Sequence, residues 1–136
     1  MKKQVKKKET NLPGAELDVM KTLWKLGEPS TVPAIHRGVL ERRKCTAPAV
    51  HILVDRLEEK GFVKVDRIET PVAYKLVTAL VTEEEYCSVA ATGLIENLFH
   101  GSWKRLIANL AESGEIKESD IKEIEKILKV SGEENK

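Results

Sequence analysis

The stretch "TAPAVHILVDRLEEKGFV", residues 46–63, has the pattern of a helix that ends at a glycine and leads directly into a strand. Its apolar residues recur at the i, i+3, i+4, i+7 spacing of one helical face, so we expect that face to be buried. They are Val50, Leu53, Val54 and Leu57. The opposite face is almost uncharged and consists of Pro48, Ala49, His51, Ile52 and Asp55. What this free face contacts depends on the fold that presents it.

Two further helices are predicted before this stretch. Residues 14–26 carry one apolar face, and residues 32–43 carry a shorter one with Ser30 or Thr31 as the cap. Thr46 is expected to cap the third helix. Three short helices joined by short links indicate a helix-turn-helix unit.

A β-hairpin is predicted after the third helix. Residues 62–68, "FVKVDRI", alternate between apolar and polar side chains as a strand does. Residues 69–71 form a turn, and residues 72–77, "VAYKLV", return as the second strand. Three helices followed by a hairpin form a winged helix, in which the third helix is the recognition helix and the hairpin is the wing.

From residue 82 onward the pattern is helical again. Thr82 and Glu85 form a T-x-x-E capping box at the start of this region. Apolar stripes then follow in residues 82–101, 102–114 and 117–130. Because no large domain is left to cover these stripes, we expect a helical arm that packs against a second copy of the chain as a homodimer.

The predicted fold is therefore mainly α with a small β wing: a winged helix-turn-helix domain followed by a C-terminal helical dimerisation arm. Residues 1–11 are expected to form a basic flexible arm and residues 12–79 the winged-helix domain. Residues 80–130 are expected to form the dimerisation region, and residues 131–136 a flexible tail.

Charge is unevenly distributed along a chain of 136 residues whose formal net charge is only +1. Residues 1–8 hold five lysines and no acid, whereas residues 112–136 hold eight acids and five bases. A basic arm on a nearly neutral protein is a common feature of nucleic-acid binding, because lysines release counterions from phosphates. The alternative is a disordered solubilising tail.

Several classes of protein are disfavoured by what the sequence lacks. Cys45 and Cys87 form no CxxC or Cys/His cluster, so we expect reduced thiols and no metal. No apolar run approaches the roughly 20 residues that span a bilayer, so no stable membrane association and a cytoplasmic location are expected. Cys45 with His51 has no third residue to orient the histidine, and no phosphate loop or paired carboxylate site is present. Neither catalysis nor a cofactor is predicted.

Five segments follow one another along the chain: "LPGAELDVMKTLWKLGEPSTVPAIHRGVLE", "VHILVDRLEEKGFV", "VAYKLV", "VTEEEY" and "LIANLAESGEIKESDIKEIEKIL". Their order and spacing resemble the penicillinase-repressor family of the BlaI/MecI/CopY type. The resemblance extends over residues 12–128, nearly the whole chain.

This resemblance implies a homodimeric winged-helix repressor that binds a palindromic operator in double-stranded DNA and blocks transcription of resistance genes. In antibiotic-responsive members, a membrane sensor-protease pathway leads to cleavage of an Asn-Phe bond in the dimerisation arm. The matching bond here is Asn109–Leu110, where leucine replaces the aromatic residue. Copper-responsive relatives end in a cysteine-rich tail, whereas this chain ends in "VSGEENK".

The recognition helix departs from the family's pattern, because Pro48 and Ala49 stand where family members usually carry a Lys-Thr pair that faces DNA. Ala49 and Ile52 are suited to contact thymine methyl groups, and His51 to donate to a base acceptor or a phosphate. Thr46, at the helix N-terminus, is suited to bind a phosphate. Further phosphate contacts are expected from Arg42, Arg43, Lys44, Arg56, Lys60, Lys64 and Arg67. The lysine arm is expected to lie in a minor groove.

A second interpretation of the same surface is a protein-interaction adaptor without sequence-specific DNA binding. Each basic residue is then part of a solvated helix face, and Arg56 forms a structural ion pair with Glu59 or Glu28. His36 is expected at the surface. The two functions differ in salt dependence, because phosphate contacts weaken as salt rises.

Overall fold

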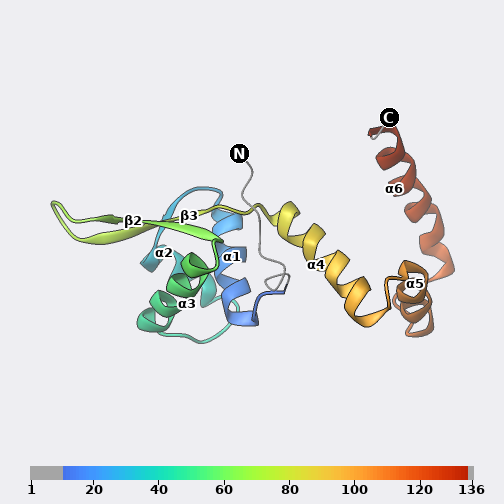
Figure 1. Cartoon of the computed structure of the whole chain (residues 1–136), viewed down its shortest axis with the longest axis horizontal. Coiled ribbons are helices and arrows are strands. Elements are labelled where there is room, and N and C mark those ends of the chain that lie inside the picture. Colours follow the sequence, from blue (N-terminus) through green and yellow to red (C-terminus); the bar gives the residue numbers. More distant parts are fainter. Residues whose placement is uncertain (1–10, 135–136) are drawn as a thin grey trace. The chain divides into compact units, whose positions relative to one another are not determined.

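The computed structural model describes residues 11–134, and the lysine-rich arm expected to contact a minor groove lies outside them. The chain divides into two compact units, one ending at Gly93 and the other beginning at Leu94. The elements appear in Figure 1: α1 Gly14–Leu26, β1 Ser30–Thr31, α2 Val32–Val39, α3 Ala47–Glu59, β2 Val63–Ile68, β3 Tyr74–Ala79, α4 Glu83–Leu98, α5 Trp103–Glu112, η2 Glu118–Asp120 and α6 Ile121–Glu134. The predicted class, mainly α with a small β wing, is confirmed.

Side-chain caps begin the second and third helices as the sequence predicts. Thr31 Oγ1 accepts a hydrogen bond from the Ala34 amide at 3.4 Å, and Thr46 Oγ1 accepts one from the Ala49 amide at 3.2 Å. A capping box begins α4, since Thr82 and Glu85 exchange side-chain to backbone bonds of 2.9 and 3.0 Å. These caps satisfy first-turn amides that have no acceptor within the helix.

The predicted end of the second helix is wrong by four residues. We expected it at residue 43, but α2 ends at Val39 and a turn follows. The amides of Glu41 and Arg42 bond to carbonyls only three residues back. Leu40 is 48% exposed, so no apolar side chain beyond Val39 packs inward to hold a further helical turn.

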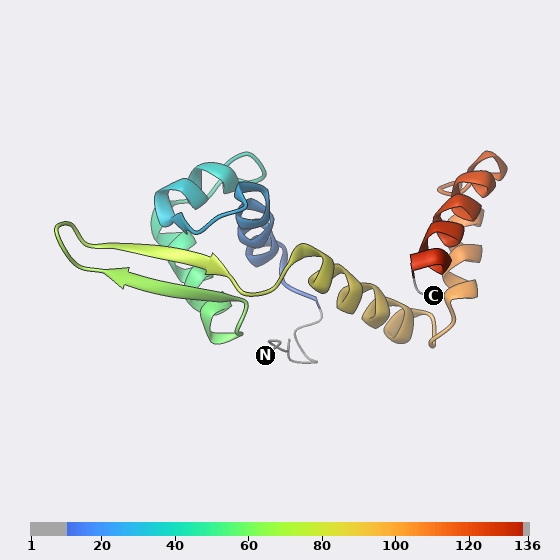
Figure 2. The ribbon, with the colours of Figure 1, turned by 90° about the horizontal axis from the view of Figure 1, so that it is seen from above.

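The sheet has one strand more than the predicted hairpin. Its order is β1-β3-β2, with both pairs antiparallel. Figure 2 shows β2 and β3 extending beyond the three helices as the wing. The added strand, β1, is only two residues long, which is too short for an alternating pattern to reveal.

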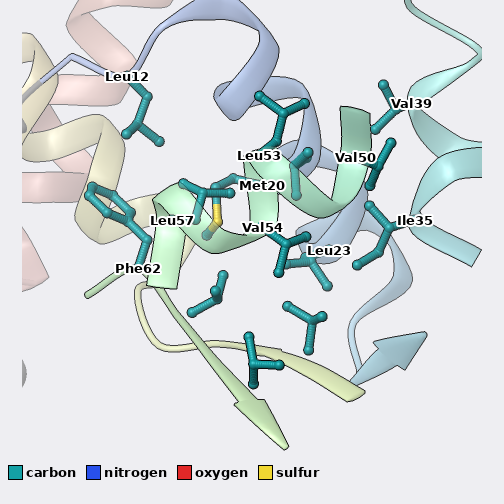
Figure 3. Packing of buried hydrophobic residues seen from close by; sticks show 14 of the residues in the cluster. Leu12, Met20, Leu23, Ile35, Val39, Val50, Leu53, Val54, Leu57 and Phe62 are labelled. Atoms are coloured by element: carbon teal, nitrogen blue, oxygen red, sulfur yellow. The ribbon is translucent and has the colours of Figure 1, made fainter. Parts of the chain in front are cut away.

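The hydrophobic core of the first unit joins the three helices to the base of the wing. In Figure 3 the labelled residues of α3 point toward those of α1 and α2, with Phe62 at one end. All four apolar residues predicted to face inward from the third helix are buried, including Val50 and Leu57 at 0% exposure. This packing leaves the opposite face of α3 uncovered within the unit.

The first turns of α4 belong to the same core. The hydroxyl of Tyr86 accepts a hydrogen bond from the Leu12 amide at 2.8 Å, and its ring meets the Phe62 ring edge-on. Trp24 Nε1 donates to the Val81 carbonyl at 2.9 Å. Tyr86 belongs to the apolar stripe of residues 82–101, which we expected a second copy of the chain to cover. For Tyr86 this expectation is wrong, because its side chain is already only 5% exposed within the unit.

Helix propensity alone predicts that Gly38 weakens α2. The structure shows why a glycine is required here, because α2 packs closely against α1 at this position. A Cβ at this position would overlap with the Cγ2 methyl of Thr22. We therefore expect Gly38→Ala to lower the free energy of unfolding by about 1–3 kcal/mol, as overpacking commonly does. Chemical denaturation measures the change.

A matched control is Gly132→Ala in α6, where nothing lies within 4 Å of the added methyl. This variant is expected to leave stability equal or slightly raised, since alanine favours a helix. Adding Thr22→Ser to Gly38→Ala removes the overlapping methyl and is expected to recover part of the loss. A Gly38→Ala protein as stable as the parent would refute the close approach of α1 and α2.

The second unit buries almost nothing by itself. None of residues 94–132 is buried, although α5 and α6 carry large apolar side chains. Trp103 is 60% exposed, Ile127 64% and Leu128 67%. Residues 131–134, expected in a flexible tail, continue α6, and residues 135–136 lie outside the described part. No helix among the described residues is long and apolar enough to cross a membrane.

Candidate nucleic-acid interface

The uncovered face of α3 presents the side chains that the sequence singled out. Ile52 is 53% exposed, and Thr46 and Arg56 are exposed as well. Ala49 and His51 are half-buried at the two edges of this face, where it meets the buried stripe. An apolar, hydrogen-bonding surface of this kind, on a helix fixed by its opposite face, can meet the edges of base pairs.

The N-terminus of α3 is a weak anion site. Pro48 has no amide hydrogen, and the Ala49 amide is already bonded to Thr46. The Val50 amide bonds to the Thr46 carbonyl. This leaves the Ala47 amide and the Thr46 hydroxyl hydrogen to meet a phosphate. The expected role of Thr46 in phosphate binding therefore rests on these two donors.

Four of the seven cations expected to contact phosphates are paired with carboxylates. Arg43 Nε lies 2.7 Å from Asp18 Oδ2, and Lys60 Nζ lies 2.6 Å from Glu16 Oε1. The remaining two pairs are Lys64 with Asp66 at 3.5 Å and Arg67 with Glu58 at 3.2 Å. The hydrogen bond and charge of Glu58 raise the pKa of Arg67.

Three cations keep their charge available within the described part of the chain. Arg42, Lys44 and Arg56 are exposed and form no salt bridge with another described residue. Neither carboxylate considered as a partner of Arg56, Glu59 or Glu28, pairs with it. The link between α2 and α3, together with Arg56, therefore supplies the unpaired positive charge beside the exposed face.

The link is held in place by His36. Its Nε2 lies 2.9 Å from the Cys45 carbonyl, so the ring donates a hydrogen bond there. We expected His36 at the surface, but it is half-buried and ties α2 to the start of α3. No group of His, Cys, Asp or Glu side chains suited to a metal ion occurs among residues 11–134.

Lys75 of the wing is a residue of this surface that the sequence analysis did not select. Its Nζ lies 3.4 Å from His51 Nδ1 and 3.8 Å from Asp55 Oδ1. The signal that could have revealed it is strand alternation, because Lys75 shares a sheet face with Val77, which is fully buried against the helices. Lys75 therefore points toward α3, beyond the edge of the core.

Asn109–Leu110, the bond that the resemblance implied as the match of a cleavage site, lies inside a helix. Asn109 and Leu110 belong to α5, where the Asn109 carbonyl accepts from the Ser113 amide at 3.1 Å. The Leu110 carbonyl accepts from the Glu115 amide at 2.9 Å. Any protease that binds its substrate as an extended strand would have to unwind this turn first.

Three helices with an exposed third helix, unpaired cations beside it and a β wing are the features of a winged-helix DNA-binding protein. The family model described as Penicillinase repressor matches residues 12–130, so the chain belongs to the penicillinase repressor family. It is a DNA-binding transcriptional repressor, as the sequence resemblance predicted.

Two solved structures of Lactococcus lactis ZitR, both of a cysteine-to-serine mutant, are similar to this chain. The complex with DNA has 18% identity and a TM-score of 0.41, and covers 93% of this chain and 77% of that one. A second structure of the same mutant has 20% identity and a TM-score of 0.37, and the match covers 100% of this chain and 80% of that one. No protein with a curated description matches the chain.

Proposed function

We propose that the chain represses transcription in the cytoplasm as a homodimer bound to a pseudo-palindromic operator, with α3 in the major groove. The observation that carries the proposal is the exposed face of α3 with unpaired Arg42, Lys44 and Arg56 around it. Phosphate contacts position a protein on DNA, and base-edge contacts specify the sequence. This surface offers both kinds of contact.

Base reading is assigned to three side chains of α3. Ala49 and Ile52 offer methyl groups to thymine methyls, and His51 offers a hydrogen-bond donor to a base acceptor. No lysine or arginine points from the centre of this face, so its preference is expected to favour A·T-rich half-sites. Arg56 lies toward the end of the helix and serves the backbone.

Phosphate binding is assigned first to the unpaired cations and then to the exposed paired ones. Lys64 and Arg67 of the wing keep side-chain exposures of 59% and 51%, so their ion pairs can exchange for phosphates. Arg43 is 42% exposed and can do the same. Lys60 is assigned a structural role instead, because its partner Glu16 is buried.

A two-fold dimer would place two recognition helices in successive major grooves, with half-sites about 34–36 Å apart. The apolar side chains left exposed in α5 and α6 support this assembly. A sensor-protease pathway acting on Asn109–Leu110 would have to cut a bond that is helical and lacks the aromatic residue. We assign no catalytic role to any residue.

The test is selection of bound sequences from a random duplex pool by the full-length protein at two salt concentrations. A pseudo-palindrome is expected, and His51→Ala is expected to relax one base position per half-site by about 1–3 kcal/mol. Arg42→Ala is the matched control, because losing a phosphate contact weakens all sequences equally and lowers the salt slope by about 1.

Binding that is sensitive to salt but blind to sequence would contradict base reading by α3. Binding that does not depend on salt, or no binding at all, would favour the protein-interaction adaptor.

A further inference from the structure

The strands of the wing place two cations opposite each other on the side that faces α3. In the β2–β3 register, Val65 lies opposite Val77 and Arg67 opposite Lys75. Residues opposite each other in antiparallel strands share a face, and here the valine pair is buried against the helices. The next pair on this face, Arg67 and Lys75, lies beyond the core and therefore meets charged residues of α3.

The contacts confirm this placement. Arg67 is bonded to Glu58, and Lys75 lies between Asp55 and His51, which are four residues apart on one side of α3. The side chain of Lys75 is only 27% exposed, whereas that of Asp55 is 55% exposed. The ammonium group therefore lies within ion-pair distance of Asp55, 3.8 Å from its Oδ1, and faces the imidazole of His51.

The chemistry of this contact determines where His51 carries its proton. A lysine ammonium group has three donors and no acceptor. Nδ1 of His51, 3.4 Å from Lys75 Nζ, must therefore be the acceptor, which requires an unprotonated Nδ1. In the neutral ring the hydrogen then lies on Nε2.

We propose that Lys75 is a positioning residue for sequence recognition: it fixes His51 as the Nε2–H tautomer and presents that group to the DNA as a donor. This rests on the proposed function of α3. Acceptors in the major groove are N7 of purines, O6 of guanine and O4 of thymine, whereas cytosine offers only a donor there. The base that His51 meets is therefore guanine, adenine or thymine, and cytosine at that place is disfavoured.

The tautomer is measured on the free protein by ¹⁵N NMR of the His51 ring at pH 8.5, well above the ordinary histidine pKa of about 6.5. The parent is expected to show a protonated Nε2 and an unprotonated Nδ1. Lys75→Met is expected to add a measurable Nδ1–H population, and Lys75→Arg, which keeps a donor, to restore the parent spectrum. A matched control is Lys64→Met, an exposed wing lysine paired with Asp66, which should leave the ring unchanged.

Operator binding is then compared in a double-mutant cycle. Lys75→Met is expected to reduce discrimination against cytosine at the His51 position by roughly fivefold, the lower end of what one base contact contributes. In a His51→Ala background the same substitution is expected to have no further effect on discrimination. A direct phosphate contact by Lys75 would instead weaken all sequences equally in both backgrounds.

An Nδ1–H ring in the parent, or a Lys75→Met spectrum identical to the parent, would overturn the role of Lys75 while leaving base reading by α3 intact. A confirmed tautomer without any base preference that depends on His51 would overturn the recognition role, and this outcome would also count against the proposed function. If Lys75→Met reduces base discrimination by the same factor in the His51→Ala background as in the parent, Lys75 does not act through the histidine. That result would overturn the proposal.

Discussion

The paired substitution Ile127→Glu, Leu128→Glu is expected to turn the proposed homodimer into a monomer and to lower operator affinity by about 100-fold or more. Both side chains lie on α6 and are more than 60% exposed in the single chain. When two linked recognition helices bind one operator, the second binds at a high effective concentration, which is lost when the copies separate. Sedimentation equilibrium measures the assembly, and fluorescence anisotropy with an operator duplex measures affinity.

The expected effect is large because the second unit has no core of its own. With none of residues 94–132 buried, its apolar stripes are covered only if another surface packs on them. Two glutamates at the centre of such a surface would each have to be desolvated without a partner, which disfavours association. In the monomer the same glutamates are solvated, so the winged helix should keep its fold and its salt-dependent binding to DNA.

Lys126→Glu is the matched control, since this residue lies on the opposite side of the same helix from the stripe formed by Ile121, Ile124, Ile127 and Leu128. It changes charge without placing it on the apolar face, and dimerisation should persist. If the paired variant remains dimeric at micromolar concentration, α6 is not the dimer surface. If the parent chain itself is monomeric, the homodimer proposal fails.

Sequence periodicity predicted the parts of the fold that burial controls. The apolar face of α3, the capping box of α4 and the hairpin were all evident, because each follows a repeat or a local rule within a few residues. The exposed face of α3 was predicted for the same reason, as the complement of a buried one. Local patterns could not show that Tyr86 is already covered by Leu12 and Phe62.

Which carboxylate neutralises which cation was not predictable, because the partners are distant in the sequence. Arg43 meets Asp18 across 25 positions, and Lys60 meets Glu16 across 44. The candidate phosphate contacts were therefore chosen by charge alone, and the structure separates the unpaired ones from those with partners. Lys75 was missed because a lysine on a wing strand carries no motif until the register places it beside His51.

Lys60→Met is expected to lower the free energy of unfolding by about 3 kcal/mol, which corresponds to a fall in Tm of roughly 15 °C for a domain of this size. Lys60 Nζ lies 2.6 Å from Glu16 Oε1, and the Glu16 side chain is only 4% exposed. Removing the cation leaves a buried carboxylate without its ion-pair partner, and water cannot reach it fully. Thermal and chemical denaturation measure the loss.

Replacing Glu16 instead of Lys60 should lower the free energy of unfolding much less, because the two partners are unequally buried. The Lys60 side chain is 23% exposed, so after Glu16→Leu the ammonium group can reach water while leucine fills the buried site. The double variant Glu16→Leu, Lys60→Met should regain most of the stability, as apolar replacement of a buried pair often does. If Lys60→Met is as stable as the parent, the pair contributes little. If it instead lowers the salt slope of operator binding as Arg42→Ala is expected to do, Lys60 contacts phosphate after all.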